Sequence, residues 1–115
     1  MNQRIRAYGI SIGEGTPGPL NKITDVPGVL VGHETIVNER NCTGVTVIVP
    51  SPHNIFRDKL TAASFVLNGF GKSQGLVQID ELGTLETPIA LTNTLNVGLV
   101  HDALVEYTIR RCGQT

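Results

Sequence analysis

The sequence of 115 residues is long enough for one domain with a core of its own. Apolar residues make up 40% of the chain but aromatic residues only 4%, so a core would consist mainly of Val, Leu, Ile and Ala. Nine basic and ten acidic residues give a net charge of -1, which leaves no excess positive charge for nucleic acid or for an anionic membrane surface. We therefore expect neither of these partners.

The cysteine content and the N-terminus bear on the compartment. Cys42 and Cys112 are too few for a disulfide framework, and residues 1–11 lack the apolar stretch of a secretory signal. No apolar run approaches the roughly 18 residues that cross a bilayer. We expect the chain in the reducing cytoplasm.

Residues 9–21 are rich in glycine and proline, and we expect them to form a loop. Beyond this loop, Pro27-Gly28 predicts a turn between an extended segment at Ile23–Val26 and a short strand at Val29–His33. These two segments are a candidate hairpin. The polar residues 34–43 are expected to separate this hairpin from the next strand.

Two apolar runs follow. Gly44–Val49 is rich in β-branched residues and closed by Pro50, which predicts a buried strand. Ala62–Leu67 has no decisive period, so the pattern leaves helix and strand open. The Asn68-Gly69 pair that follows favours a strand.

The last part of the chain changes from a strand pattern to a helix pattern. Pro88–Thr92 is a strand candidate, and the apolar residues that follow recur at helical spacing, which predicts a helix from about Asn96 to Arg111. Thr94 or Asn96 can serve as its N-cap, and Gly113 is the expected stop. No internal repeat or linker is visible, so we expect one domain or part of one.

Two segments match nucleotide-binding motifs only superficially. Gly13–Gly18 (GEGTPG) has the letters of the dinucleotide fingerprint, but that motif must open a helix, and Pro17 and Pro19 prevent one. Gly71–Ser73 resembles the end of a phosphate-binding P-loop, yet Val66 stands where the first glycine is needed. A glycine loop and a tight turn with an exposed lysine explain these segments better, so we expect no cofactor.

Other chemical groups do not assemble into a site either. The histidines stand far apart without a second ligand at metal-binding spacing, so we expect no metal. Neither cysteine has a local activating partner, and no serine lies in a Gly-x-Ser-x-Gly elbow. Three carboxylates in Asp80–Glu86 are better explained as a charged turn than as an acid–base pair. No catalytic residue is assigned in this chain.

A family resemblance enters through five blocks that occur in order. They are Gly18–His33 (GPLNKITDVPGVLVGH), Thr43–Thr46 (TGVT), Leu67–Lys72 (LNGFGK), Glu81–Gly83 (ELG), and Pro88–Thr94 (PIALTNT) followed by Val97-Gly98. Together they cover the chain from about Arg6 to Ile109, and they resemble the N-terminal portion of the DmpA-type family. That family holds L-aminopeptidase/D-esterases and β-peptidyl aminopeptidases. One departure is Lys22, where members commonly have alanine.

The resemblance implies a self-processing enzyme similar to N-terminal nucleophile hydrolases. Such a precursor cuts itself before a serine, whose new amino group, with a pKa of roughly 7.7–8.0, can accept the hydroxyl proton. In the family this serine, the oxyanion asparagine and the carboxylate that meets the substrate's amino end lie downstream of the matching region. The implied fold is α/β (α+β), with residues 1–115 forming part of a four-layer αββα sandwich.

The function implied for the complete protein is that of an aminopeptidase or amidase. Residues 1–115 would be the N-terminal part of its front subunit and inactive alone. The implied partners are a peptide or amino-acid amide substrate, the missing C-terminal portion, and further copies in a homo-oligomer.

Five residues are candidates for the wall of the substrate pocket, because they follow apparent strands with small or polar groups. They are Asn68, Gly69, Gly71, Asn93 and Thr94. The same residues could instead be turn and helix-cap residues, and the sequence leaves both interpretations open. Two alternative functions also remain open: a non-catalytic module that binds a partner through strand edges, and an acyltransferase on a related self-cleaving scaffold.

Overall fold

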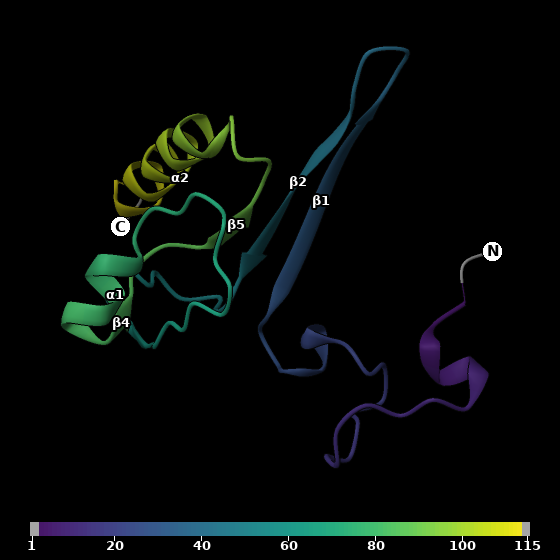
Figure 1. The fold of residues 1–115 in the computed structure, drawn as a ribbon. Helices are drawn as coiled ribbons and strands as arrows, with labels where there is room; N and C mark the ends of the chain where they lie inside the picture. Colours follow the sequence, from purple (N-terminus) through teal and green to yellow (C-terminus); the bar gives the residue numbers. More distant parts are fainter. Residues whose placement is uncertain (1–2, 114–115) are drawn as a thin grey trace.

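The structure is a computed structural model that describes residues 3–113. Its first part contains two short 3-10 turns, Ile5–Tyr8 and Ile23–Asp25, joined by the predicted loop (Figure 1). The Asp25 carboxylate organises the end of this loop, because it accepts hydrogen bonds from the backbone N–H of Leu20 at 3.0 Å and of Lys22 at 3.1 Å. The extended segment predicted at Ile23–Val26 is therefore wrong, since these bonds favour a tight turn.

The long hairpin of the molecule lies further along the chain than predicted. Strand β1 spans Leu30–Val37 and strand β2 spans Cys42–Val49, paired antiparallel from Leu30 opposite Val49 to Val37 opposite Cys42. Asn38 closes the turn, because its Oδ1 accepts the backbone N–H of Arg40 at 3.0 Å and of Asn41 at 2.8 Å. The polar residues 34–43 thus belong mostly to the hairpin and do not separate two elements.

A third strand completes the larger sheet. Strand β5, Ile89–Leu91, pairs antiparallel with β2, so the strand order is β1-β2-β5. The predicted strands at Gly44–Val49 and Pro88–Thr92 are confirmed, but the burial expected for the first is not, because no residue of β2 is fully buried. Because side chains alternate along strands, the part of the sheet where all three strands pair places six side chains on one face, which we call the open face. These are Val31, His33, Thr46, Ile48, Ile89 and Leu91.

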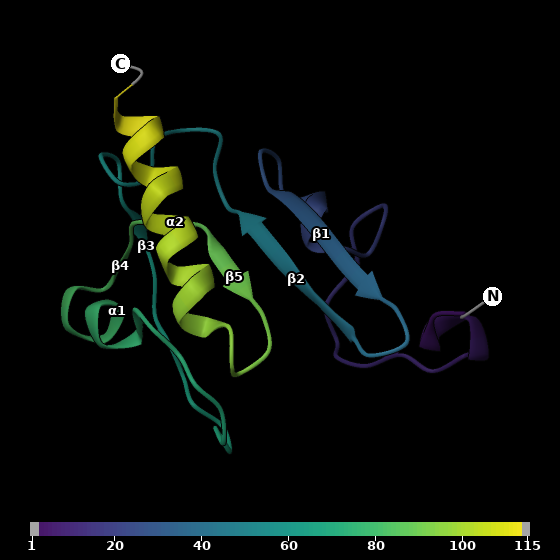
Figure 2. The same cartoon turned by 90° about the horizontal axis from the view of Figure 1, so that it is seen from above.

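Helix α2, Val97–Cys112, lies against the other face of this sheet, as the two ribbon views show (Figures 1 and 2). The predicted helix is confirmed, with Asn96 at the N-cap position and Gly113 at the C-cap. The last turn of the helix is tied to the loop after β2, where Arg111 donates to the carbonyl of Pro52 at 3.0 Å and Arg57 donates to the carbonyl of Cys112 at 3.1 Å.

A smaller unit lies beside α2. Strand β3 (Leu60–Thr61) pairs with β4 (Thr84–Leu85), and the short helix α1 (Leu76–Leu82) precedes β4. The charged turn predicted at Asp80–Glu86 is thus wrong in part, because Asp80 and Glu81 belong to α1. That helix is bounded by glycines with positive φ at both ends, Gly75 and Gly83, a C-terminal signal that the sequence contained.

The segment between β3 and α1 projects as an arm, residues 62–75, that leaves the body and returns (Figure 2). The strand favoured at Ala62–Leu67 is wrong, because only Leu60 and Thr61 pair with another strand. The arm carries Phe65 at 87% and Phe70 at 105% exposure. Its apolar residues therefore lack the cover that a strand in a sheet would receive.

The molecule buries little of its surface. Among residues 3–113 only Ser51, Ile55 and Pro88 are buried. The accessible surface is 9418 Å², against roughly 6,100 Å² for a compact monomer of this mass. The radius of gyration is 16.5 Å, against about 13 Å for a compact domain. In the part of the chain that the structure describes, no helix is long and apolar enough to cross a membrane.

Candidate functional site

The candidate site is an open groove of about 740 Å³ between the arm and the start of α2. Its walls come from two segments that are distant in the sequence, Gly71–Gln74 on the returning limb of the arm and Thr94–Gly98 at the beginning of α2. Figure 2 shows this limb passing near the first turn of the helix. The volume lies within the roughly 300–1,000 Å³ typical of ligand pockets.

Two of the five residues proposed from sequence meet in this groove. Gly71 and Thr94 line opposite walls, although they are 23 positions apart in the sequence. Asn68 and Gly69 lie just before the groove in a turn, where Asn68 has a φ of 51° and its carbonyl accepts the N–H of Phe70 at 2.9 Å. A methyl group at Gly69 would collide with a terminal methyl of the exposed Val66 side chain, which would have to move.

Asn93 has its side chain engaged in the fold. Its Oδ1 accepts the backbone N–H groups of Leu95 and Asn96, both at 3.1 Å, and its Nδ2 donates to Thr43 Oγ1 at 3.0 Å. These bonds attach the connection between β5 and α2 to strand β2. Asn93 thereby fixes the wall of the groove on which Thr94 lies, which is the turn role that the sequence left open for it.

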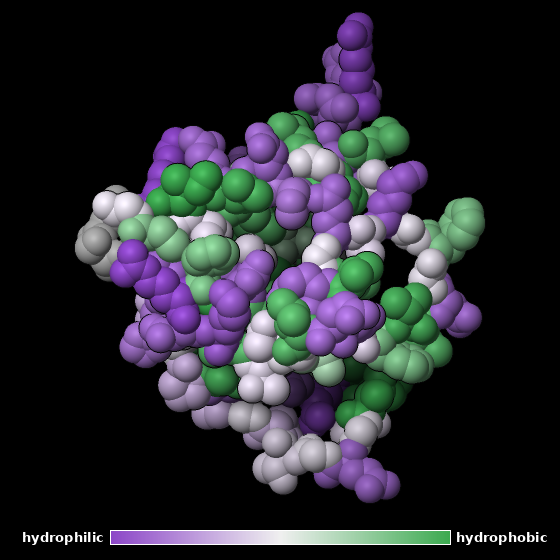
Figure 3. All heavy atoms as spheres, turned by 90° about the vertical axis from the view of Figure 1, so that its left-hand side faces the viewer, coloured by the Kyte–Doolittle hydropathy of each residue, from purple (hydrophilic) through white to green (hydrophobic). Residues whose placement is uncertain are grey.

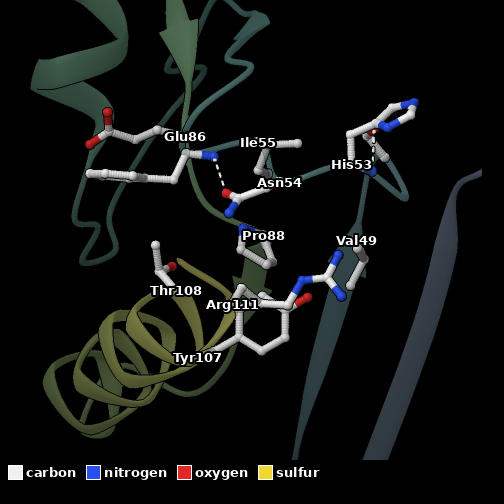
Figure 4. Close-up of a pocket in the computed structure, with 11 residues that line it drawn as sticks. Val49, His53, Asn54, Ile55, Glu86, Pro88, Tyr107, Thr108 and Arg111 are labelled. Atoms are coloured by element: carbon white, nitrogen blue, oxygen red, sulfur yellow. Dashed lines mark hydrogen bonds between the residues drawn. The ribbon is translucent and has the colours of Figure 1, made fainter. Parts of the chain in front are cut away.

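A second, much smaller cavity lies beneath the last turns of α2. It is bounded by the loop after β2, by Pro88 and by the helix residues Tyr107, Thr108 and Arg111 (Figure 4). The ring of His53 points away from this cavity. The space, about 20 Å³, has room for roughly one water molecule and none for a substrate.

The remaining chemical groups are dispersed or locally paired. Ser64 Oγ donates to Asp80 Oδ1 at 2.5 Å, which joins the arm to α1. Glu86 pairs with Lys59 at 3.2 Å. Within residues 3–113, no three His, Cys, Asp or Glu side chains gather as metal ligands do. The carboxylates of Asp80 and Glu86 thus have different partners.

The sequence alone does not predict most of the groove. Lys72, Ser73 and Gln74 on the arm, and Leu95, Val97 and Gly98 on α2, were not candidates. A partial signal is present, since Gly71–Ser73 resembles the end of a phosphate-binding loop. The sequence does not show that Gly71–Ser73 lies opposite the beginning of α2.

Comparison with known sequences decides the family. The sequence profile of peptidase family S58 matches residues 21–115. The chain belongs to this family. The resemblance to DmpA-type aminopeptidases, seen first in the five ordered blocks, is thereby confirmed.

Among S58 relatives, the chain is 42% identical over 115 residues to a β-peptidyl aminopeptidase, BapA, from Sphingosinicella xenopeptidilytica, an alignment that covers 92% of this chain. A Burkholderia sp. β-aminopeptidase of known structure is 52% identical, with a TM-score of 0.82 over 94% of this chain and 32% of the other. The PH0078 protein from Pyrococcus horikoshii OT3 is 44% identical, with a TM-score of 0.85 over 94% of this chain and 33% of the other.

These comparisons also show how much of its relatives' length the chain covers. It spans about 28% of the length of the curated relatives that it matches. The described residues form a mixed α/β arrangement with antiparallel sheets, which agrees with the β-aminopeptidase structure. The activity, substrates and assembly of these relatives are properties of their complete chains.

Proposed function

We propose that residues 1–115 are the N-terminal part of the front subunit of an aminopeptidase or amidase. The complete protein would release N-terminal residues from peptides, amides or esters. It would use a serine that becomes a new N-terminus by self-cleavage downstream of Thr115. The observation that carries this proposal is the S58 match, together with β-peptidyl aminopeptidase relatives of which the chain spans only 28%.

The low burial of the chain supports its dependence on further polypeptide. Ile89 is 41% and Leu91 57% exposed on the open face, where they lie on the edge strand β5 opposite Ile48 and Thr46. Sheets in globular proteins cover such a face with a second layer. We propose that the downstream part covers the open face with a second sheet, which would give the four-layer αββα sandwich with α2 as an outer layer.

The outer position proposed for α2 agrees with the molecular surface. On the side that carries α1 and α2, hydrophilic and apolar side chains are interspersed (Figure 3). Such a mixed surface suits solvent better than a buried interface. The sandwich therefore predicts different tolerance for charge on the two layers.

A matched pair of substitutions in the complete protein tests the sandwich. Ile89→Glu would bury an unpaired carboxylate between sheets and should destabilise the protein by about 3 kcal/mol or more. Ile109→Glu, on α2 at 65% exposure, should change stability by less than about 1 kcal/mol. Urea unfolding measures both. Equal effects of the two substitutions would contradict the layer order.

The groove between the arm and α2 is the part of the substrate pocket that we propose this chain supplies. Gly71 and Thr94 would form its walls, with Asn68, Gly69 and Asn93 shaping the adjoining turns. No described residue is proposed as the nucleophile. A cytoplasmic homo-oligomer remains part of the proposal.

The gene region beyond Thr115 tests the enzymatic proposal directly. The complete product should split before a serine, which intact mass detects, and should release amine from aminoacyl anilides. The 115-residue chain alone should give no turnover. A genuine stop after Thr115 without a downstream Gly-Ser region, or turnover by the pure 115-residue chain, would contradict the proposal.

The same assay separates the two alternatives. Transfer of the acyl group to an added amine, in preference to water, would indicate an acyltransferase. A stably folded 115-residue monomer that lacks activity and binds a specific protein would indicate a binding module. The exposed edge strand β1 is the feature that such a module would use.

A further inference from the structure

Lys72 stands out among the basic residues of the second half of the chain. Between Pro50 and Gly113 there are five Lys and Arg residues. Four of them bond to other described residues: Arg57 to the Cys112 carbonyl, Lys59 to Glu86, Arg110 to Glu106, and Arg111 to the Pro52 carbonyl. Lys72 has no hydrogen bond or ion pair with any residue from 3 to 113.

The position of Lys72 indicates which kind of ligand it could bind. Lys72 lines the groove, and the other seven lining residues carry no charge. A ligand in the groove therefore meets one positive charge and no carboxylate from the described residues. The ammonium group of a peptide meets no carboxylate on these walls, whereas a carboxylate meets the Lys72 ammonium.

The rest of the groove suits the body of a short peptide. Leu95 is 91% exposed on the wall opposite Lys72, and Phe70, next to Gly71, is fully exposed. These side chains offer apolar surface beside the cation. The groove of about 740 Å³ is large enough for a drug-sized ligand.

We propose that Lys72 is a specificity-determining residue that recognises the free carboxylate at the C-terminal end of a short peptide substrate. This inference rests on the proposed aminopeptidase function. The substrate class would be small peptides, such as dipeptides, in preference to the same peptides with an amidated C-terminus. The flexible stem of lysine lets one ammonium follow carboxylates at slightly different positions.

The test uses the complete enzyme, including the sequence beyond Thr115, and two dipeptide substrates that differ only in a free or amidated C-terminus. The wild type should show a KM about tenfold lower for the free acid, which corresponds to one charge-assisted hydrogen bond. Lys72→Met should raise the KM for the free acid to that for the amide. Lys72→Arg should keep most of the preference, and Lys22→Met, in the N-terminal loop, serves as the matched control.

The possible outcomes are distinct. Equal KM values for the two substrates in the wild type would overturn the proposal. So would a Lys72→Met enzyme that loses activity on both substrates equally and melts at a lower temperature, because Lys72 would then pair with a carboxylate of the protein itself. Absence of turnover on both dipeptides and on aminoacyl anilides would instead contradict the proposed function.

Discussion

The first 28 residues and the residues after β2 are held by hydrogen bonds that differ greatly in sequence separation. In the second half, hydrogen bonds between the loop after β2 and the end of α2 join residues 55 to 59 positions apart. In the first 28 residues, the side-chain bonds of Arg4 and Asp25 span 3 to 17 positions. The bonds between the loop after β2 and the end of α2 therefore lock elements together that are distant in the sequence, whereas the bonds within the first 28 residues only shape a loop.

The two regions also differ in how much apolar surface they bury. The N-terminal segment has a defined loop around Asp25, yet Ile10 is 51% and Ile12 75% exposed. The second half places Ile55, 6% exposed, beneath a helix and a loop. A segment can thus have a specified backbone without a core of its own, because local hydrogen bonds fix conformation and only non-local packing buries apolar surface.

The largest effect on stability is expected in the interlocked half. Ile55→Ala in the complete protein should lower the free energy of unfolding by about 2–4 kcal/mol, because it removes buried methyl groups and leaves a cavity. The control is Ile5→Ala, at 48% exposure, with an expected loss under about 1 kcal/mol. Urea midpoints compare the two. A larger loss at Ile5 would mean that the N-terminal segment is the better buried half in the complete protein.

An intermediate effect is expected at the loop. Asp25→Asn replaces one acceptor oxygen with a donor that faces the N–H of Lys22. The free energy that stabilises the loop should therefore fall by about 1–2 kcal/mol. Amide hydrogen exchange at Leu20 and Lys22 should accelerate, while the β1–β2 hairpin stays protected. Asp58→Asn, where the carboxylate makes no such bond within the described residues, is the control. Loss of hairpin protection would show that the loop is coupled to the sheet.

The smallest effect is expected for the ion pair between Lys59 and Glu86. Their side chains are 36% and 31% exposed, so the pair should contribute less than about 1 kcal/mol and fade as salt is added. A double-mutant cycle with Lys59→Met and Glu86→Gln measures the coupling. A coupling that persists in 1 M salt would show that the complete protein buries this pair.

The sequence predicted the elements whose signal is local. The β-branched run of β2 indicates a strand, and the helical spacing of α2 indicates a helix, without knowledge of the elements that pack against them. Strand β1 was seen only as far as His33, because the polar residues that continue it through Val37 adopt extended backbone by pairing with β2. Ala62–Leu67 shows the converse, since an apolar run does not become a strand where no neighbour pairs with it.

The candidate site was predictable to a similar degree. Gly71 and Thr94 were chosen because each follows an expected element end, and both line the groove. The local pattern at Gly71–Ser73 predicts an exposed lysine in a tight turn after a strand. Lys72 is exposed, but it lies in an irregular part of the arm and Ala62–Leu67 before it is not a strand. Its place opposite Leu95 arises from the path of the arm back to α2, a non-local arrangement that no motif in the segment encodes.

Strand β1 has a practical consequence for handling the chain. It lies at the edge of its sheet with eight residues, and it contains no proline and no lysine. Natural proteins use such residues, short lengths or bulges to discourage one edge from pairing with another. A preparation of residues 1–115 by itself is therefore expected to aggregate through β1 as its concentration rises. A lysine introduced at Thr35 should slow this aggregation, which light scattering would measure.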